Sequence, residues 1–428
     1  MTTGVVLLTR DLRRRDNPAL AAAARDFDRV VPLFVFDPRL LDGRHASPNR
    51  LAFLLDSLAD LDRGFGGGLV TRTGDPTEET LRVAVEAGAT MIDLCADHSG
   101  HARRREVGLR RAAAAAGIRI RVHPGVAVVD PGALVPAGGD HYAVFTPYHR
   151  RWLTARWRLA EPSPKRLRIA TGIASQPWPS RPANGSPALP EGGESAGRNR
   201  LDRWLAEGLD GYASLADDLA ADATSRLSPY LHFGCVSPLE TARGALAAGG
   251  PGAEPFVRQL CWRDFHLQVL AARTDLPTID YRSRGDHWRE DAAAFDRWRQ
   301  GRTGVPIVDA GMRQLLGEGW IANRARLVAA SYLVKDLYLD WRLGAGHFME
   351  WLVDGDLASN SGNWQWVAGT GNDTRPNRVI SPARQSARFD PRGEYARRHI
   401  PELGSSDYPR PLVDHQDAVA RFREARGR

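Results

Sequence analysis

The sequence predicts an α/β domain with a parallel, Rossmann-like sheet, followed by a large all-helical domain. Short β-rich runs alternate with longer helical stretches at the start of the chain, which is the pattern of a parallel sheet covered by helices. A stretch rich in proline, glycine and serine follows, and beyond it apolar residues recur at helical spacing. At 428 residues the chain is also too long for one ordinary core. We therefore expect an α/β domain at residues 1–130, an interdomain linker at 131–199 and a helical domain at 200–428.

The composition describes a globular protein with a basic surface. Hydrophobic residues make up 43% of the chain and charged residues 25%, which excludes a disordered or fibrous protein. The net charge of +7 is carried mainly by arginine and permits, without requiring, a nucleic-acid partner. Cys95, Cys235 and Cys261 are expected to be buried thiols in a reducing compartment, with no disulfide and no metal site. The first apolar run is too short for a signal peptide or a membrane span, so we expect a cytoplasmic protein.

The expected strands and helix starts follow in order along the first domain. Two helices begin with a cap residue followed by proline, at Asn17–Pro18 and at Asp75–Pro76. The first strand lacks the glycine-rich motif that binds dinucleotides. It runs instead into the basic stretch Thr9–Asn17, which is expected to be a solvated loop or, alternatively, an anion site. The five expected strands are Val5–Leu8, Val30–Phe36, Leu69–Thr71, Met91–Cys95 and Ile118–Val122.

The stretch Asp354–Trp366 has the densest polar and aromatic chemistry of the chain. Asp354 and Asp356 accept hydrogen bonds, Asn360 both donates and accepts them, and two indoles offer flat apolar surfaces. Together they indicate a binding site for a large, flat ligand with a polar edge. Arg326 is a natural partner for one of the two carboxylates, because a buried aspartate requires a cation. The alternative is a polar loop followed by two tryptophans of the core.

Further polar patterns in the helical part also suit a ligand. Thr224–Ser228 precedes a proline at an expected helix start, and its hydroxyls, arginine and backbone amides suit a phosphate group, with a helix cap as the alternative. On a helix, Gln259, Trp262, Arg263 and His266 share one face. A polar and aromatic face of this kind is expected to line a cavity or a partner surface.

Several spaced motifs, in the same order along the chain, resemble the signature of the DNA photolyase and cryptochrome family. The resemblance covers nearly the whole chain and is strongest from residue 222 to 400. It implies an α/β antenna domain, a linker and a helical domain that binds FAD in a folded conformation, in agreement with the architecture expected above. The motifs that carry the resemblance are Thr224–Ser228, Trp262–Phe265, Gly304–Ala310, Asn323–Arg324, Lys335–Asp336, Asp354–Asp356 and Asn360–Trp366.

The resemblance assigns flavin contacts to residues of the helical domain. The segment Thr224–Ser228 resembles the family's site for the flavin phosphates and ribityl chain. Arg326 pairs with Asp354, which with Asp356 lies against the flavin ring, and Asn360 resembles the asparagine that faces the flavin N5 and influences its redox state. The cofactor-binding residues implied in this way are Tyr212, Thr224, Ser225, Arg226, Leu227, Ser228, Arg263, Arg326, Asp354, Gly355, Asp356 and Asn360.

Light-driven repair of cyclobutane pyrimidine dimers in DNA is the activity that the resemblance implies. The lesion leaves the duplex and enters a pocket beside the flavin, excited reduced FAD donates one electron, the cyclobutane bonds split and the electron returns. Trp364, Trp341 and Trp288 resemble the family's chain of three tryptophans, which brings an electron from the surface to the flavin. The catalytic residues implied are Asn360, Gln259, Trp288, Trp341 and Trp364. The DNA-binding residues implied are Gln259, Trp262, Arg263, Asn323, Arg324 and Trp366.

The sequence departs from the family pattern at a few positions. Gln259 stands where dimer photolyases usually have a glutamate that hydrogen-bonds the damaged bases, and the same substitution occurs in 6-4 photolyases and many cryptochromes. The paired histidines of 6-4 photolyases would fall at Asn323 and Leu327, which argues against that activity. A cryptochrome-type blue-light photoreceptor is the alternative to the lyase, although the short stretch that follows Pro401–Leu403 favours the enzyme.

The expected second chromophore and partners follow from the same comparison. Ala102 falls at the position of the glutamate that contacts folate in the antenna domain, so a deazaflavin suits this chain better than folate, and an empty antenna site is the alternative. We expect the protein to act as a monomer on UV-damaged DNA, without a membrane.

Overall fold

The structure is a computed structural model in which the chain forms two compact units. The residues that it describes are 1–43, 46–372 and 375–427. Unit 1 comprises residues 1–184, 190–209 and 225–274. Unit 2 comprises residues 185–189, 210–224 and 275–428. Helical segments as far as residue 274 therefore group with the sheet, and the expected domain boundaries at 130 and 200 stay predictions.

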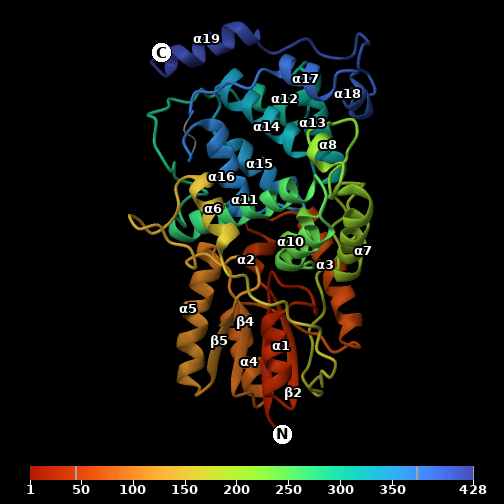
Figure 1. Ribbon diagram of the computed structural model, residues 1–428, viewed down its shortest axis with the longest axis vertical. Helices are drawn as coiled ribbons and strands as arrows, with labels where there is room; N and C mark the ends of the chain where they lie inside the picture. Colours follow the sequence, from red (N-terminus) through yellow and green to blue (C-terminus); the bar gives the residue numbers. More distant parts are fainter. Residues whose placement is uncertain (44–45, 373–374, 428) are drawn as a thin grey trace. The chain divides into compact units, whose positions relative to one another are not determined.

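Unit 1 contains the expected sheet and a set of helices (Figure 1). Its strands are β1 (Thr3–Leu8), β2 (Arg29–Phe36), β3 (Val70–Thr73), β4 (Met91–Cys95) and β5 (Arg119–His123). Its helices are α1 (Pro18–Asp26), α2 (Pro38–Leu41), α3 (Pro48–Gly64), α4 (Pro76–Glu86), α5 (Gly100–Ala115), α6 (Phe145–Thr154), α7 (Glu194–Arg203), the π-helical turn η1 (Trp204–Gly208), α9 (Ser228–Phe233), α10 (Pro238–Ala248) and α11 (Ala253–Ala272).

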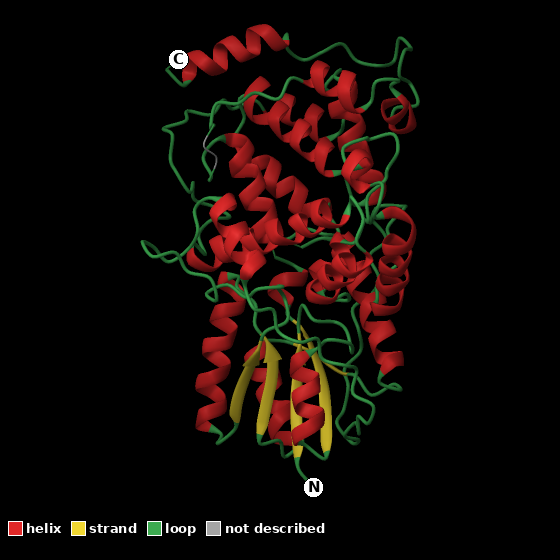
Figure 2. Cartoon of the chain, in the orientation of Figure 1, coloured by secondary structure: helices red, strands yellow, loops and turns green. Residues whose placement is uncertain are grey.

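The five strands are all parallel and have the order β3-β2-β1-β4-β5. Helix α1 packs on β1, β4 and β5, α4 packs on β1, β2 and β3, and α5 packs on β5 and α4. Figure 2 shows helices in front of and behind the strands, so β1 and β4 are buried throughout their length. The prediction of a parallel α/β sheet is confirmed. From β1 the chain adds β2 and β3 on one side of the sheet, and then β4 and β5 on the other. The topological switch point therefore lies between β1 and β4.

The two expected helix starts are confirmed. The side chain of Asn17 accepts a hydrogen bond from the backbone N–H of Leu20 at 3.0 Å, and Asp75 accepts one from Thr77 at 2.8 Å. In both helices proline follows the cap, where its missing N–H costs no hydrogen bond.

The basic stretch after β1 differs from the expected solvated loop. Arg13 is 1% exposed, and its guanidinium donates to the backbone carbonyls of Asp16, Gly125 and Gly234 at 2.8 to 3.1 Å. A planar cation with five donors satisfies several carbonyls at once, which a run of charges in the sequence does not reveal. The arginine therefore holds loops of unit 1 together instead of facing solvent or an anion.

The segment after α6 is hydrogen-bonded along the edge of the sheet. Ala170 donates its backbone N–H to the carbonyl of Val30 at 2.9 Å, and Val30 donates to the carbonyl of Arg168 at 2.9 Å. Further on, Gln176 donates to the carbonyl of Thr71 at 2.9 Å, and the Thr71 hydroxyl donates to the carbonyl of Gln176 at 2.8 Å. This part of the expected linker therefore belongs to unit 1 and continues the sheet beyond β2 and β3.

Asp264 on α11 links three parts of unit 1. Its side chain is fully buried, and its Oδ2 accepts hydrogen bonds from the backbone N–H groups of Val128 and Val129 at 3.0 Å and from the indole of Trp152 at 2.9 Å. Burial raises the pKa of this carboxyl to about 6. The other oxygen, Oδ1, has no hydrogen-bond partner among the described residues.

Unit 2 is helical, as predicted for this part of the chain. Trp298, Trp341 and Trp364, each at most 2% exposed, lie in its core. Within the described residues no helix is long and apolar enough to cross a membrane. The helices of unit 2 are α8 (Tyr212–Leu215), α12 (Ala292–Arg299), α13 (Pro306–Glu318), α14 (Asn323–Ser331), the π-helical turn η2 (Tyr332–Asp336), α15 (Trp341–Trp351), α16 (Leu357–Ala368), α17 (Pro382–Phe389), α18 (Glu394–His399) and α19 (His415–Ala425).

The three cysteines are buried, free thiols, as expected from the sequence. Burial raises the pKa of Cys235 to about 12 and also raises the pKa of Cys95 and Cys261. The cysteines therefore stay protonated and act as small apolar residues of the core.

Candidate functional site

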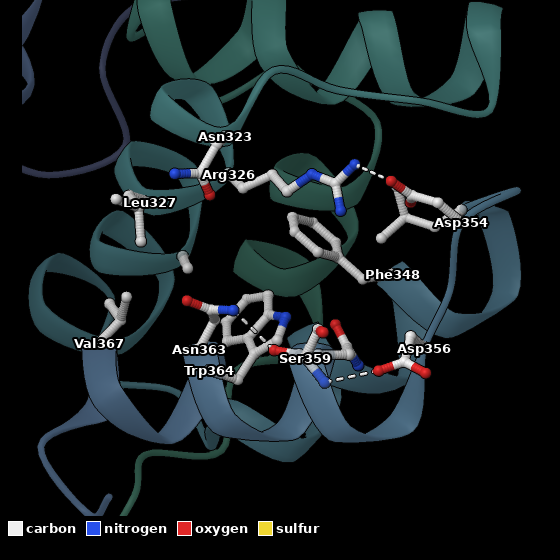
Figure 3. A pocket seen from close by; sticks show the side chains of 13 residues that line it. Asn323, Arg326, Leu327, Phe348, Asp354, Asp356, Ser359, Asn363, Trp364 and Val367 are labelled. Atoms are coloured by element: carbon white, nitrogen blue, oxygen red, sulfur yellow. Dashed lines mark hydrogen bonds and ion pairs between the residues drawn. The ribbon is translucent and has the colours of Figure 1, made fainter. Parts of the chain in front are cut away.

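Helices α14, α15 and α16 of unit 2 border a pocket with a cavity volume of about 70 Å³ (Figure 3). Each of the two flanking helices, α14 and α16, contributes side chains that recur every three or four residues and therefore project from one face. The pocket is lined by Asn323, Arg326, Leu327 and Ala330 from α14, by Phe348 and Leu352 at α15, and by Asp354, Asp356, Ser359, Asn360, Asn363, Trp364 and Val367 at α16.

Asp356 fixes where α16 begins. Its Oδ1 accepts a hydrogen bond from the backbone N–H of Ser359 at 2.9 Å, which is the geometry of a helix N-cap. The cap turns the chain so that Asp354 and Asn360, on either side of Asp356, both line the pocket. The dense polar stretch of the sequence is thus a loop and a helix start at one wall of a cavity.

An ion pair between Arg326 and Asp354 spans one side of the pocket, as Figure 3 shows. The guanidinium Nη2 lies 2.7 Å from Oδ2 of Asp354, and Nε donates to the carbonyl of Ile321 at 2.8 Å. The Asp354 side chain is 3% exposed, and Arg326 supplies a cation that offsets the cost of burying its charge. Its Oδ1 is buried without a hydrogen-bond partner among the described residues, which leaves one strong acceptor for a donor that a ligand brings.

Asn360 is oriented by the neighbouring helix. Its Nδ2 donates to the backbone carbonyl of Ala345 on α15 at 3.0 Å. This contact fixes the plane of the amide at the pocket wall and leaves the amide oxygen as an acceptor. Asn360 is therefore suited to accept a hydrogen bond from a ligand at the same end of the pocket as Asp356.

The rest of the pocket wall is apolar and partly flat. Phe348 and Trp364 pack edge to face with their ring centroids 5.0 Å apart, and Leu327 and Val367 continue the apolar surface. A cavity with apolar walls and a few convergent polar groups is the usual form of a cofactor site. The geometry fits the flat ligand with a polar edge that the sequence indicates.

Trp364 and Trp341 of the predicted electron chain belong to the core of unit 2, and Trp288 packs against that core. Trp364 fits against α15 because Gly344 has no side chain: a Cβ at this position would lie 2.1 Å from Cη2 of the indole. Trp341, at the start of α15, donates its indole N–H to Asp280 at 2.9 Å. Trp364 and Trp341 are buried, whereas Trp288 is only half-buried. The roles of the three tryptophans in electron transfer stay predictions.

Gly344→Ala is expected to lower the free energy of unfolding by about 1–3 kcal/mol, because the added methyl group must displace Trp364 or the backbone of α15. Chemical denaturation measures the loss. Gly346→Ala is the matched control on the same helix: a Cβ there meets nothing within 4 Å, and the change is expected to be neutral or slightly stabilising. Equal losses in the two variants would contradict close packing at Gly344.

The other predicted residues of unit 2 lie in and around this region. Asn323 lines the pocket, whereas Arg324 forms an ion pair with Asp217 at 2.6 Å and packs over the ring of Phe389 at 4.4 Å. Trp366 is half-buried against the core. Their DNA-binding roles stay predictions.

The phosphate-binding segment begins in unit 2 and continues in unit 1. Tyr212 is half-buried, and burial raises its pKa to about 12. The Thr224 hydroxyl is buried and has no hydrogen-bond partner among the described residues. Arg226 has a φ of 49°, in the left-handed region, and the Ser225 hydroxyl accepts the backbone N–H of Leu227 at 3.3 Å. The roles of Thr224, Ser225, Arg226, Leu227 and Ser228 stay predictions.

Three predicted residues lie on α11 of unit 1. Gln259 is exposed and Trp262 is half-buried, with its ring stacked on Phe145 of α6 at a centroid distance of 3.6 Å. Arg263 donates to the backbone carbonyls of Val126 and Leu231 at 2.5 and 3.2 Å. Arg263 thus has a structural task within unit 1, and its contacts with cofactor or DNA stay predictions.

A second polar cluster lies at the carboxyl end of the sheet in unit 1. It is formed by loops that follow β1, β2 and β4, and by the start of α5. His101 lies 3.1 Å from Asp37, which follows β2, and Arg10 lies 3.6 Å from Asp97, which follows β4. Polar atoms buried without a hydrogen-bond partner among the described residues are the hydroxyl of Thr9, Nε2 of His98 and Nε of Arg105. Buried polar atoms that lack a hydrogen-bond partner at the switch point of a parallel sheet are suited to bind a ligand.

Sequence reasoning missed part of the pocket. Ala330, Phe348, Leu352 and Val367 line it without having been singled out, and Ser359 and Asn363 lie in the stretch Asp354–Trp366 without a role of their own assigned to them. The signal for the residues on α16 was present, because Asn363 and Val367 follow Asn360 at helical spacing. Phe348 and Leu352 carry no such signal, since they look like any other core residues of α15.

Comparisons with known proteins agree with this geometry. Residues 4–167 match the family described as DNA photolyase, and residues 256–407 match the FAD binding domain of DNA photolyase. A deoxyribodipyrimidine photo-lyase of Streptomyces griseus is 51% identical to the chain over 453 residues, which cover 100% of both proteins.

Solved structures of the same kind superpose on the whole chain. A class III photolyase from Agrobacterium tumefaciens has a TM-score of 0.94 at 30% identity, covering 100% of this chain and 97% of its own. A cryptochrome from Synechocystis sp. PCC6803 has a TM-score of 0.91 at 28% identity, covering 99% of each. A photolyase from Sulfolobus tokodaii, solved with two FAD molecules, has a TM-score of 0.87 at 28% identity and covers 99% of each. The chain belongs to the DNA photolyase family and contains that family's FAD-binding domain.

Proposed function

We propose that this protein is a deoxyribodipyrimidine photo-lyase, which uses light to repair cyclobutane pyrimidine dimers in DNA. The observation that carries the proposal is the pocket of unit 2, where a buried carboxylate with one unmatched oxygen and a fixed amide face flat apolar walls. FAD, when bound, supplies the one-electron donor that light excites. The high identity to the lyase of Streptomyces griseus over its full length supports the same activity.

The residues of the pocket bind and orient the flavin in this proposal. Asp354 accepts a hydrogen bond from the polar edge of the ring, and Arg326 holds that carboxylate in place through their ion pair. Asn360 offers its amide oxygen to a ring N–H, while Phe348 and Trp364 form apolar surfaces that exclude water. Tyr212, Gly355 and the segment from Thr224 to Ser228 complete the site for the ribityl chain and phosphates.

The lesion-binding residues act on a flipped-out dimer in this proposal. Gln259 hydrogen-bonds the damaged bases, and Trp262 stacks on them. Trp366 and Asn323 also contact the lesion. Arg263 and Arg324 lie beside its phosphates. Phosphate contacts carry no sequence information, so binding is expected to weaken with salt and to ignore the flanking sequence. Extrusion costs least at a damaged, poorly stacked pair, which itself provides selectivity. The protein works as a monomer.

The experiment that tests the activity is repair of an oligonucleotide containing one cyclobutane dimer by the purified, photoreduced protein. Blue or near-UV light should remove the dimer, a dark control should not, and an oligonucleotide with a 6-4 lesion should stay unrepaired, since the residues at Asn323 and Leu327 offer no histidine. Light-dependent repair of the dimer would also show that a glutamine at position 259 supports the reaction.

A cryptochrome-type photoreceptor is the second candidate, because the TM-score of the Synechocystis cryptochrome, 0.91, lies between those of the two photolyases. Flavin binding and photoreduction without repair of either lesion would favour it.

A second, light-harvesting chromophore is also part of the proposal. Support comes from the cluster at the carboxyl end of the sheet, where Thr9, His98 and Arg105 have unmatched buried polar atoms. Burial also lowers the pKa of His98, so this ring is neutral and offers both a donor and an acceptor. A deazaflavin suits the site better than folate, because Ala102 is only 3% exposed and has no carboxylate for the pterin. The absorption spectrum of purified protein would identify the pigment.

Asn360→Asp is expected to leave the fold and FAD binding intact and to change which redox state of the flavin persists under light. The carboxylate is nearly the same shape as the amide, but its negative charge disfavours added electron density on the ring and it cannot donate to Ala345. Visible absorption during illumination measures the effect, with bound flavin per protein as the control. Loss of flavin binding would contradict the role assigned to Asn360.

A further inference from the structure

Trp288 lies in ring contact with a tyrosine. The ring centroids of Trp288 and Tyr338 are 5.1 Å apart, and the ring planes are tilted by 50°. The chain beside these residues is paired, because Arg289 donates its backbone N–H to the carbonyl of Tyr338 at 2.9 Å. The backbone pairing therefore holds the two segments that carry these rings side by side.

The hydroxyl of Tyr338 has a proton acceptor. It donates to Oδ1 of Asp286 at 3.1 Å. Arg426 holds this carboxylate in place with two contacts, at 2.5 and 2.6 Å, and both side chains are at most 4% exposed. Burial, followed by the charge of Asp286, raises the pKa of Tyr338, so the phenol is neutral at neutral pH. An electron removed from this ring must therefore be accompanied by loss of the hydroxyl proton.

The backbone at Tyr338 is held in an uncommon conformation. Its φ is 54°, in the left-handed region that a bulky residue rarely adopts. Leu339 donates its N–H to the carbonyl of Leu333 at 3.1 Å, and Phe422 of α19 packs against the ring of Tyr338 at 6.0 Å. The surrounding structure thus imposes a strained position that places this ring against Trp288, which is a reason to look for a function.

We propose that Tyr338 is the terminal electron donor of the tryptophan chain. This inference rests on the proposed function and on the tryptophan chain predicted from the sequence. The bound flavin, excited by light, would supply the oxidant for Trp364, and the oxidised site would move through Trp341 to Trp288. Tyr338 then gives one electron to the Trp288 radical cation. The phenolic O–H bond breaks and the proton passes to Oδ1 of Asp286. The products are neutral Trp288, a neutral tyrosyl radical and a protonated Asp286.

The proton transfer stabilises the separated charges. A neutral tyrosyl radical has no charge that needs solvation. A tryptophan radical cation in a half-buried position has a charge that is only partly solvated. Return of the electron requires return of the proton from Asp286, which slows recombination. Tyr338 is half-buried and keeps some contact with solvent, so a thiol in solution can reduce the tyrosyl radical and make the photoreduction permanent.

The test uses the FAD-loaded protein with oxidised flavin, illuminated with and without a thiol. Electron paramagnetic resonance and transient absorption distinguish tyrosyl from tryptophanyl radicals. The wild type is expected to form a tyrosyl radical, more slowly in D₂O than in water. Tyr338→Phe is expected to retain a tryptophanyl radical, and its yield of photoreduced flavin should fall several-fold. Asp286→Asn keeps the hydrogen-bond acceptor without the base and should slow formation of the tyrosyl radical. Tyr408→Phe is the matched control, because its hydroxyl donates to Asp309 at 2.7 Å in the same core.

The outcomes separate the inference from the function on which it rests. A tyrosyl radical that persists in Tyr338→Phe, or a wild type that forms only a tryptophanyl radical, would overturn the role of Tyr338 while leaving the tryptophan chain intact. A wild type that binds FAD but shows no photoreduction and no protein radical would overturn the chain itself. Thermal unfolding of each variant shows that it is folded before illumination.

Discussion

Asp264→Ala is expected to lower the free energy of unfolding by about 3 kcal/mol or more, the largest loss that we predict for a single residue of unit 1. The substitution leaves three buried donors without a partner: the backbone N–H groups of Val128 and Val129 and the indole of Trp152. Each buried donor that loses its partner costs about 1–3 kcal/mol. Urea denaturation followed by circular dichroism measures the change.

Two further variants test the origin of this loss. Asp296→Ala removes a carboxylate that pairs with Arg299 at the surface, with both side chains about half-exposed, and should change stability by less than about 0.5 kcal/mol. Asp264→Asn keeps one acceptor oxygen and should lose less than the alanine variant. A loss in Asp264→Ala no larger than that in Asp296→Ala would refute the bridging role of Asp264.

The same carboxyl also predicts a pH dependence. Burial raises its pKa from 3.8 in the unfolded chain to about 6 in the folded protein, so between these values the folded state binds the extra proton. The proton is accommodated on Oδ1, which has no hydrogen-bond partner among the described residues and lies 3.8 Å from Nη1 of Arg263, while Oδ2 keeps its three donors. The stability contributed by protonation is complete below about pH 4 and is lost as the pH rises through about 6. Asp264→Asn should lack this part of the pH dependence.

Arg326→Ala is expected to reduce affinity for FAD by at least about a hundredfold. The substitution leaves Asp354 with a buried, unpaired charge, which costs about 3–5 kcal/mol. This cost destabilises the wall of the pocket that contacts the flavin ring in the proposal. Titration of apoprotein with FAD, followed by quenching of flavin fluorescence, gives the dissociation constant.

A surface ion pair provides the control for this prediction. Arg392 pairs with Glu394 at 2.8 Å, with side chains 78% and 43% exposed, so Arg392→Ala should leave FAD affinity unchanged. Asp354→Asn should weaken binding as well, because the neutral amide no longer balances Arg326. Wild-type affinity in Arg326→Ala would show that the flavin does not depend on this pair.

Local sequence patterns were sufficient to predict the sheet and one wall of the pocket. The strands are nearly continuous β-branched and apolar runs because helices cover the sheet, and such runs are conspicuous in any sequence. The helix starts at Asn17 and Asp75 depend on one side chain and the proline that follows, so a few adjacent letters predict them. Asp354, Asp356 and Asn360 were found for the same reason, since they lie close together in the chain.

Features that depend on partners distant in the sequence were not predicted. Arg13 looks like one charge of a basic run, but its three carbonyl partners lie in separate loops, one of them more than 200 residues away. Phe348 becomes a pocket wall only because α15 packs against α16. No sequence pattern predicts the contact of Tyr338 with Trp288, because it arises from the backbone pairing of two segments 50 residues apart.

The hydrogen bonds of the connector to Val30 and Thr71 also matter for solubility. A strand at the rim of a sheet presents unpaired N–H and C=O groups that can join the same rim of another molecule. Residues 168–176 occupy these groups beside β2 and β3, so that side of the sheet is closed by the protein's own chain. A protein shortened to its first 130 residues would expose this rim, and strand-to-strand aggregation would compete with its folding. The connector therefore serves the α/β part as a guard against self-association as well as a link to the helices.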